Sequence, residues 1–274
     1  MKPTKTARSD ANRPIVIRKM GFSFADLPNH WFGDDPVRTH IVNGLHFVFP
    51  AGERFFIRSL KPFKDQMPAE LQERIRGFSG QEAHHQLEHR HAFEAIEEQG
   101  YDVQSFLSWY ERLAYKVIEP RVDPVDRLST TAALEHYTAI LGEFVLTSDA
   151  LDDCHPLMRD LLLWHACEEI EHKSVTFDVL QEVDPRYRHR VAGFVIGSSL
   201  LFFFWGAGIR HMLEQEPEEK RRNSLRSALS ELSSTLAHLV PRALDYLRPS
   251  FHPDDHDNYH LAKEYLEKIG RLTA

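Results

Sequence analysis

Residues 81–89 read QEAHHQLEH and residues 164–179 read WHACEEIEHKSVTFDV, and these two stretches decide the fold. Each contains the pattern Glu-x-x-His, formed by Glu82 with His85 and by Glu169 with His172. Because residues three apart on a helix share one face, each carboxylate and its imidazole can reach a metal ion on that face. A single such pair is common on exposed helices, so its surroundings decide what it means.

Both patterns interrupt an apolar helical stripe at its centre. The helix predicted between Pro68 and Gly100 has an inward stripe made of Leu71, Ile75, Phe78, Glu82, His85, His89, Ala92 and Ile96. The helix predicted over residues 156–182 has an inward stripe made of Met158, Leu161, His165, Glu169, His172, Thr176 and Val179. Buried carboxylates need a compensating cation. The sequence therefore predicts an all-α fold in which a four-helix bundle holds a dinuclear metal centre.

Each of the other two helices of such a bundle should contribute one glutamate. Glu53 is the candidate on the first helix, which begins after Asp35. On the third, predicted over residues 129–150, Glu135 and Glu143 compete, and they lie about 80° apart around a helix of 3.6 residues per turn. Antiparallel packing on the fourth helix brings Glu135 to the level of the second pattern, so Glu135 is preferred and Glu143 is the alternative.

Polar neighbours of the two patterns extend the candidate site. His165 lies one turn before the second pattern, and His89 one turn after the first. Each is either a further metal ligand or a core histidine bonded to a carboxylate. Gln81 and Glu168 directly precede the two glutamates, and we expect them to hold a ligand histidine in the right tautomer or to reach the metal themselves.

Composition and length limit the remaining choices. The 274 residues suffice for one large domain, with an irregular segment at 1–34, the bundle at 35–184, and an apolar helix with C-terminal helices at 185–274. A net charge of −8 argues against a nucleic-acid partner. Only two cysteines occur, Cys154 and Cys167, and the start of the chain is polar and basic. We therefore expect a cytoplasmic protein without disulfides or a secretory signal.

The stretch VAGFVIGSSLLFFFWGAGI at residues 191–209 contains no charged residue and is long enough to span a bilayer. Basic residues flank it on both sides, so the positive-inside rule gives it no orientation. Gly193 and Gly197 have the spacing that lets two helices pack closely. Two interpretations stay open: a helix buried in the fold or in a homodimer interface, and a helix that contacts or spans a membrane.

The ligand order Glu, Glu-x-x-His, Glu, Glu-x-x-His resembles that of the ferritin-like di-metal carboxylate superfamily over about residues 36–184. The two opening stretches, together with GERFF at residues 52–56, resemble a bacterial family described as predicted metal-dependent hydrolases. The spacing His165-x-x-x-Glu169-x-x-His172 is similar to that of arylamine N-oxygenases, di-iron enzymes with an additional histidine ligand. The resemblances imply a ferritin-like four-helix bundle with additional C-terminal helices, and His165 as a metal ligand.

Two metal ions are expected, with iron first and manganese or zinc as alternatives, because all three accept carboxylate and imidazole ligands. The leading hypothesis is an O2-activating non-haem di-iron oxygenase or oxidase, which takes electrons from a donor and acts on a small organic substrate. Thr138 and Thr176, on the inward stripes, would line its pocket. The alternatives are a metal-dependent hydrolase of an ester or phosphoester, and a non-catalytic iron-binding bundle.

Overall fold

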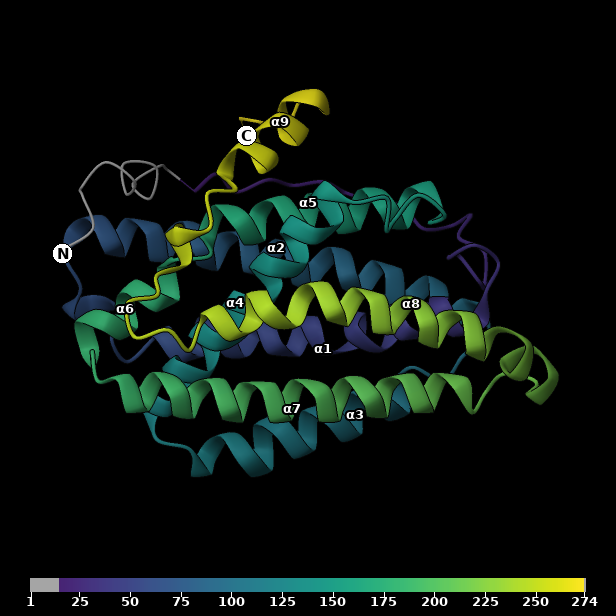
Figure 1. Cartoon of the computed structure of the whole chain (residues 1–274), viewed down its shortest axis with the longest axis horizontal. Coiled ribbons are helices and arrows are strands. Elements are labelled where there is room, and N and C mark those ends of the chain that lie inside the picture. The colour runs from purple at the N-terminus through teal and green to yellow at the C-terminus, as the bar shows by residue number, and fades with distance from the viewer. Residues whose placement is uncertain (1–14, 274) are drawn as a thin grey trace.

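The computed structural model describes residues 15–273, apart from one side chain at position 227, and the regular structure within this part is helical, without a strand. Figure 1 shows the long helices lying side by side, with the C-terminal helix above them. The predicted all-α fold is confirmed. Of the segment expected to be irregular, residues 1–14 lie outside the described part and residues 15–34 contain no helix.

Four helices carry the predicted ligands: α1 (Pro36–Leu60), α2 (Ala69–Glu98), α4 (Pro124–Thr147) and α5 (Pro156–His172). The carboxylate of Asp35 accepts hydrogen bonds from the backbone N–H groups of Val37 and Arg38, which fixes the start of α1. α1 packs against α2 and α4, and α5 packs against the same two helices. The inward faces of the four helices therefore meet in a common core.

α4 begins at Pro124, so the start predicted at residue 129 is wrong. Asp123 is the N-cap, because its carboxylate accepts a backbone N–H of the first turn at 2.9 Å and proline follows it, as in α1. The Ser129 hydroxyl donates instead to the carbonyl of His189 at 2.6 Å. This bond ties α4 to the start of α7 (Tyr187–Leu213).

The helix predicted as continuous over residues 156–182 is divided into α5 and α6 (Val175–Val183). Lys173, at the break, is 1% exposed. Its ammonium donates to the backbone carbonyl of His256 at 2.5 Å and to the side chain of Asn258 at 2.6 Å. A buried ammonium needs such acceptors, and they lie on the C-terminal segment, so the backbone leaves the regular helix where this side chain turns toward them.

α7 packs against α1 and α4 along three of its glycines. A Cβ atom at Gly193 would overlap Ser129 of α4, and one at Gly208 would lie 3.1 Å from the Cα of Gly44 in α1. The close helix contact predicted for Gly193 and Gly197 is made within the chain, because a Cβ atom at Gly197 would also lie 3.4 Å from the backbone oxygen of Thr130 in α4. These contacts bury one face of α7.

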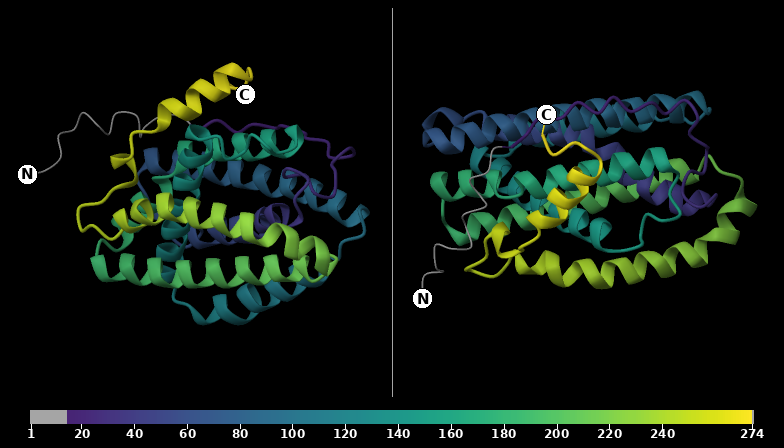
Figure 2. Two further views of the ribbon diagram at one scale, coloured as in Figure 1. Left: turned by 45° about the vertical axis from the view of Figure 1, so that its right-hand side comes forward. Right: turned by 90° about the horizontal axis from the view of Figure 1, so that it is seen from above.

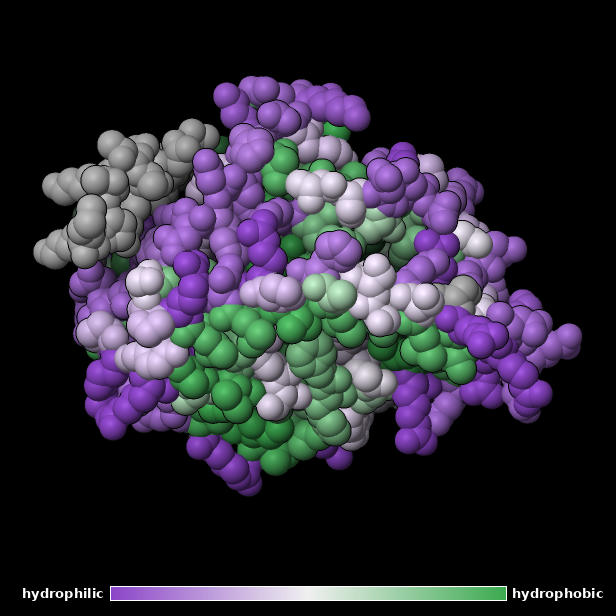
Figure 3. All heavy atoms as spheres, in the orientation of Figure 1, coloured by the Kyte–Doolittle hydropathy of each residue, from purple (hydrophilic) through white to green (hydrophobic). Residues whose placement is uncertain are grey.

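The opposite face of α7 is exposed and apolar. The exposed fractions of Val195 and Phe203 are 57% and 54%, and Figure 3 shows apolar surface over α7 and the adjacent part of α8 (Glu218–Asp245). By length and composition α7 could cross a membrane, and 28% of its most apolar window is buried. Contact of this face with a bilayer or with a second copy stays a prediction.

The remaining helices cover the outside of the core. α3 (Gln104–Glu111) continues into a π-helical turn over Arg112–Ile118, and α9 (Tyr259–Lys268) packs on α5. α8 contacts α1 and α4, and Figure 2 shows it running along the outside of the molecule. α7 and α8 thus lie beside the helices that carry the predicted ligands, and they enclose space next to them.

Candidate metal centre

The structure brings seven of the predicted ligands together between α1, α2, α4 and α5. They form two groups, within each of which one donor atom per residue lies within 4.8 Å of the others: Glu53, His85 and His165; and Glu82, Glu135, Glu169 and His172. We call these seven residues the seven-residue centre, and each of them is at most 4% exposed. The helical seams therefore place four carboxylates and three imidazoles in one buried volume.

Glu82 and Glu169 connect the two groups. The Oε1 atom of Glu82 lies 3.4 Å from the Nε2 atom of His172, and its Oε2 atom lies 3.9 Å from the Nδ1 atom of His85. Glu169 does the same, with Oε2 at 3.4 Å from His172 and Oε1 at 3.4 Å from His85. Each of the two carboxylates thus offers one oxygen to each group.

Unpaired polar atoms in the seven-residue centre are consistent with the binding of metal ions. Most of its donor atoms are buried without a hydrogen-bond partner among the described residues: both carboxylate oxygens of Glu53, Glu82 and Glu135, Oε2 of Glu169, Nδ1 of His85 and Nε2 of His172. Buried polar atoms are almost always hydrogen-bonded, so a concentration of unpaired ones needs an explanation. Cations bound among them would compensate for their burial, and carboxylate and imidazole donors suit iron, manganese or zinc.

Gln81 fixes the tautomer of His172. The amide nitrogen of Gln81 donates to the carbonyl of Val16 at 2.9 Å and to the carboxylate of Glu171 at 2.8 Å. Its oxygen is therefore the atom 2.9 Å from Nδ1 of His172, and it can only accept. In the neutral ring of His172, Nδ1 must therefore carry the proton, and the lone pair of Nε2 faces the carboxylates of Glu82, Glu135 and Glu169.

Glu168 fixes His85 in the same way. Its Oε2 atom lies 2.9 Å from Nε2 of His85, while its Oε1 atom accepts a hydrogen bond from Arg18 at 3.0 Å. The proton of His85 therefore sits on Nε2, and the lone pair of Nδ1 faces the centre. Arg18 also pairs at 2.6 Å with Glu171, which accepts the hydrogen bond from Gln81, so one guanidinium contacts the partner of His85 directly and the partner of His172 through Glu171. Gln81 and Glu168 thus lie beside His172 and His85, and the binding of metal by these two histidines stays a prediction.

His89 contacts His165 on the side away from Glu169. Its Nε2 atom lies 2.9 Å from Nδ1 of His165, whose Nε2 atom lies 2.8 Å from Glu169. His89 is in neither donor group; its nearest approach to Glu53 is 3.9 Å. Beyond it, the ring of His46 packs edge-on at 4.3 Å between centroids. Sequence reasoning missed His46, although it lies seven residues before Glu53, on the same stripe of α1.

Burial and the contacts between its residues shift the pKa values of the centre toward forms in which positive charge compensates the carboxylates. It raises the pKa of Glu53 to about 8 and that of Glu135 to about 7, and it raises the pKa of Glu82 as well. For His85 and His172, burial alone would lower the pKa, but the facing carboxylates outweigh it and raise the value. Burial alone would raise the pKa of Glu169, but its contacts with His172 and His165 outweigh burial and hold this pKa below its usual range. Protons or metal ions must therefore accompany the four carboxylates.

A cavity of about 650 Å³ adjoins the centre at His165 and Glu169. α1, α4, α5, α7 and α8 form its walls, and a smaller cavity of about 100 Å³ reaches Glu53 from the side of the π-helical turn. Thr138 lines both cavities, as expected of a pocket residue, whereas the buried Thr176 lines neither. The larger cavity falls in the size range of sites for small organic molecules, roughly 300–1,000 Å³.

Glu143, the alternative to Glu135, lies outside the centre. Its carboxylate pairs with Arg242 and accepts a hydrogen bond from the amide of Asn258 at 2.9 Å. The two glutamates therefore point to different partners, as their angular separation around α4 predicted.

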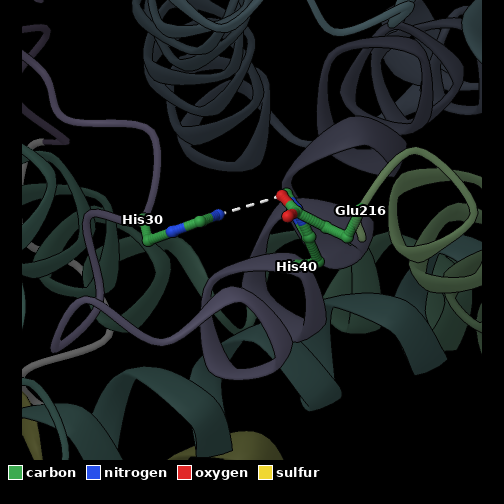
Figure 4. Close-up of side chains that lie close together, drawn as sticks. All are labelled: His30, His40 and Glu216. Atoms are coloured by element: carbon green, nitrogen blue, oxygen red, sulfur yellow. Dashed lines mark hydrogen bonds and ion pairs between the residues drawn. The ribbon is translucent and has the colours of Figure 1, made fainter. Parts of the chain in front are cut away.

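A third group with metal-binding residue types lies elsewhere, and we call it the Glu216 cluster. It joins His30, His40 and Glu216, and the Nε2 atoms of both histidines lie 2.9 Å from the same oxygen, Oε1 of Glu216 (Figure 4). The hydroxyl of Tyr101 donates to that oxygen as well. None of the donor atoms of these three residues is left buried and unpaired. The hydrogen bonds of the cluster connect the N-terminal segment and α1 to the turn after α7.

Comparison with known proteins gives one match. A family model described as "predicted metal-dependent hydrolase" matches residues 16–257. The chain belongs to this family. No curated protein and no solved structure matches the chain.

The family assignment names a class of enzyme and a requirement for metal. The matched range contains the seven-residue centre, both cavities and the Glu216 cluster. It also continues through α7 and α8, beyond the four helices that carry the predicted ligands. The helices that enclose the larger cavity are therefore part of the family's common sequence.

Proposed function

We propose that this chain is a hydrolase with two metal ions, which Glu53, Glu82, His85, Glu135, His165, Glu169 and His172 would hold. The buried oxygen and nitrogen atoms that face one another without hydrogen bonds carry this proposal, and the family description supports the reaction class. When bound, two such ions supply an acidified water and polarise a substrate carbonyl or phosphoryl oxygen, or, as iron, activate O2.

The protein prepares the site for an ester or phosphoester in three ways. Glu82 and Glu169 span the two groups and keep them at a fixed separation. Gln81 and Glu168 hold histidine protons on the outer ring nitrogens, so that the inner nitrogens are free to bind. The cavity beside His165 admits a small substrate to one edge of the centre.

O2 activation is a second candidate, because one observation favours it. The larger cavity meets the centre at a histidine, His165, and its walls there include Leu45 and Phe49. Apolar walls beside the reacting centre limit side reactions of a reactive oxidant, and mixed carboxylate and imidazole donors suit iron. This reaction would need O2 and an electron donor as partners.

Metal analysis followed by two matched assays tests the proposal. We expect two metal ions per chain, hydrolysis of p-nitrophenyl esters or p-nitrophenyl phosphate without O2, and loss of that activity in Glu169→Ala. O2 consumption with a reductant, in the absence of any hydrolysis, would replace the hydrolase with the second candidate. Protein that binds no more than one ion under any loading condition would contradict the dinuclear centre itself.

A further inference from the structure

The larger cavity contains a polar side chain that the metal centre does not use. His46, on α1, is 0% exposed, and neither of its ring nitrogens has a hydrogen-bond partner among the described residues. It lines the cavity together with His165. A buried imidazole without partners is rare, because its desolvation costs free energy that a hydrogen bond normally offsets.

The neighbours of His46 leave its nitrogens free. Its ring packs against His89 at 4.3 Å and Phe49 at 6.0 Å between centroids, and both are ring contacts rather than hydrogen bonds. The hydroxyl of Thr138, another polar group of the cavity wall, already donates to the carbonyl of Glu135 at 3.0 Å. His46 is therefore the unused donor and acceptor near the inner end of the cavity.

Among the described residues that line the cavity, Arg38 is the one with a Lys or Arg side chain, and it is already paired, while the carboxylate of Asp149 is exposed to solvent. Arg38 pairs with Asp153 at 3.0 Å and with Glu231 at 2.9 Å. Much of the wall between is apolar, with side chains such as Leu141, Phe144 and Trp205. Such a chamber suits a molecule that is largely apolar and uncharged and that has a polar group at one end.

We propose that His46 binds the polar group of a neutral, largely apolar carbonyl compound in this cavity, at the edge of the metal centre. The inference rests on the proposed function in that the natural ligand would be an apolar ester. The N–H of His46 would donate to the carbonyl or ether oxygen and hold the reacting end beside His165. His46 is in this sense a positioning residue, since it contacts the substrate without contacting the proposed metals.

Binding of two matched ligands tests the inference without any turnover. Butyrophenone and butylbenzene have similar size, and only the former has a carbonyl group. We expect His46→Leu to weaken butyrophenone binding about three- to tenfold, the value of one hydrogen bond, and to leave butylbenzene binding unchanged. Both affinities are measured on the full chain as purified, and again after removal of metal, by displacement of a neutral fluorescent probe.

Two further variants control the experiment. His136→Leu removes a buried histidine of α4 that lines neither cavity, and it should leave both affinities unchanged. Leu232→Trp, on α8, should fill the cavity and weaken both ligands.

Three results would overturn the inference: equal effects of His46→Leu on the two ligands, no effect on butyrophenone, or no binding of either ligand to the wild-type chain. Because the affinities are also measured without metal, these results are distinguishable from a failure of the dinuclear centre, which metal analysis reports.

Discussion

The seven-residue centre and the Glu216 cluster contain the same residue types, but their polar atoms are hydrogen-bonded in the second and mostly not in the first. In both, histidine and glutamate donor atoms lie within 4.8 Å of one another. In the seven-residue centre most of these atoms are buried and unpaired, whereas in the Glu216 cluster three donors converge on one carboxylate oxygen. Residue type and proximity therefore do not identify a metal site, and the placement of protons does.

The tautomers show this difference most clearly. Trp31 can only donate, so the atom of Asn43 that it contacts at 3.1 Å is the oxygen, and the amide nitrogen of Asn43 faces Nδ1 of His40 at 3.2 Å. The proton of neutral His40 is thus on Nε2, where it donates to Glu216. Gln81 does the reverse to His172, because it offers an oxygen and leaves the inner nitrogen with a lone pair.

The largest expected effect is the loss of metal from the seven-residue centre when a bridging carboxylate is removed. Glu169→Ala removes oxygens that face both histidine groups, so the bound metal should fall from two ions per chain to one or none, measured by elemental analysis. Glu143→Ala is the matched control, since this glutamate of α4 pairs with Arg242. Two ions retained in Glu169→Ala would refute the assignment.

The next effect concerns the tautomer of His172. Gln81→Leu keeps the size of the side chain but removes the oxygen that accepts the Nδ1 proton, and metal affinity should fall about 10- to 100-fold. Gln86→Leu, on the same helix, is the control, because its amide nitrogen bonds to no described residue. Competition with a chelator measures both affinities, and equal values for the two variants would show that tautomer control is unimportant.

Local patterns of the sequence predict the first of these regions far better than the second. The all-α fold and the stripes of α2 and α5 follow from helical periodicity, which is visible within one segment. The choice of Glu135 needs in addition only the antiparallel packing of two helices that are neighbours in the sequence. The Glu216 cluster depends on a contact between His40 and Glu216, which are 176 positions apart, and no local pattern indicates it. The break at Lys173 has the same origin, since its acceptors lie on the distant C-terminal segment.

Some errors arose from local signals that were weighed wrongly. Asp123 and Pro124 repeat the start signal of Asp35 and Pro36, yet the predicted helix begins only at residue 129. His46 lies on the α1 stripe with Glu53, but it has no acidic neighbour at motif spacing, and the sequence analysis does not single it out.

In the Glu216 cluster, a substitution should affect stability and leave metal content unchanged. Glu216→Gln keeps the shape but removes the charge that three donors share, so the free energy of unfolding should fall by about 1–3 kcal/mol. Chemical denaturation of the metal-free chain measures this change, and elemental analysis should still find two ions per loaded chain. A metal ion lost from this variant would show that the Glu216 cluster, too, binds metal, and that hydrogen bonding does not distinguish it from the seven-residue centre.

The smallest expected effect is the pH dependence of that stability difference. Burial alone would raise the pKa of Glu216, but hydrogen bonds from Tyr101, His40 and His30 outweigh it and lower the pKa from 4.5 to about 2. A carboxylate with a lowered pKa stabilises the fold above its unfolded pKa, and this contribution is lost as the pH falls toward the folded value. The difference in unfolding free energy between the wild type and Glu216→Gln should therefore be constant near neutral pH and shrink steadily below about pH 4.5. The carboxylates of the seven-residue centre titrate in both chains, so their contributions cancel in the difference. A difference that grows on acidification would mean that Glu216 is protonated in the folded protein. Its carboxylate would then not accept the three hydrogen bonds that distinguish the Glu216 cluster from the seven-residue centre.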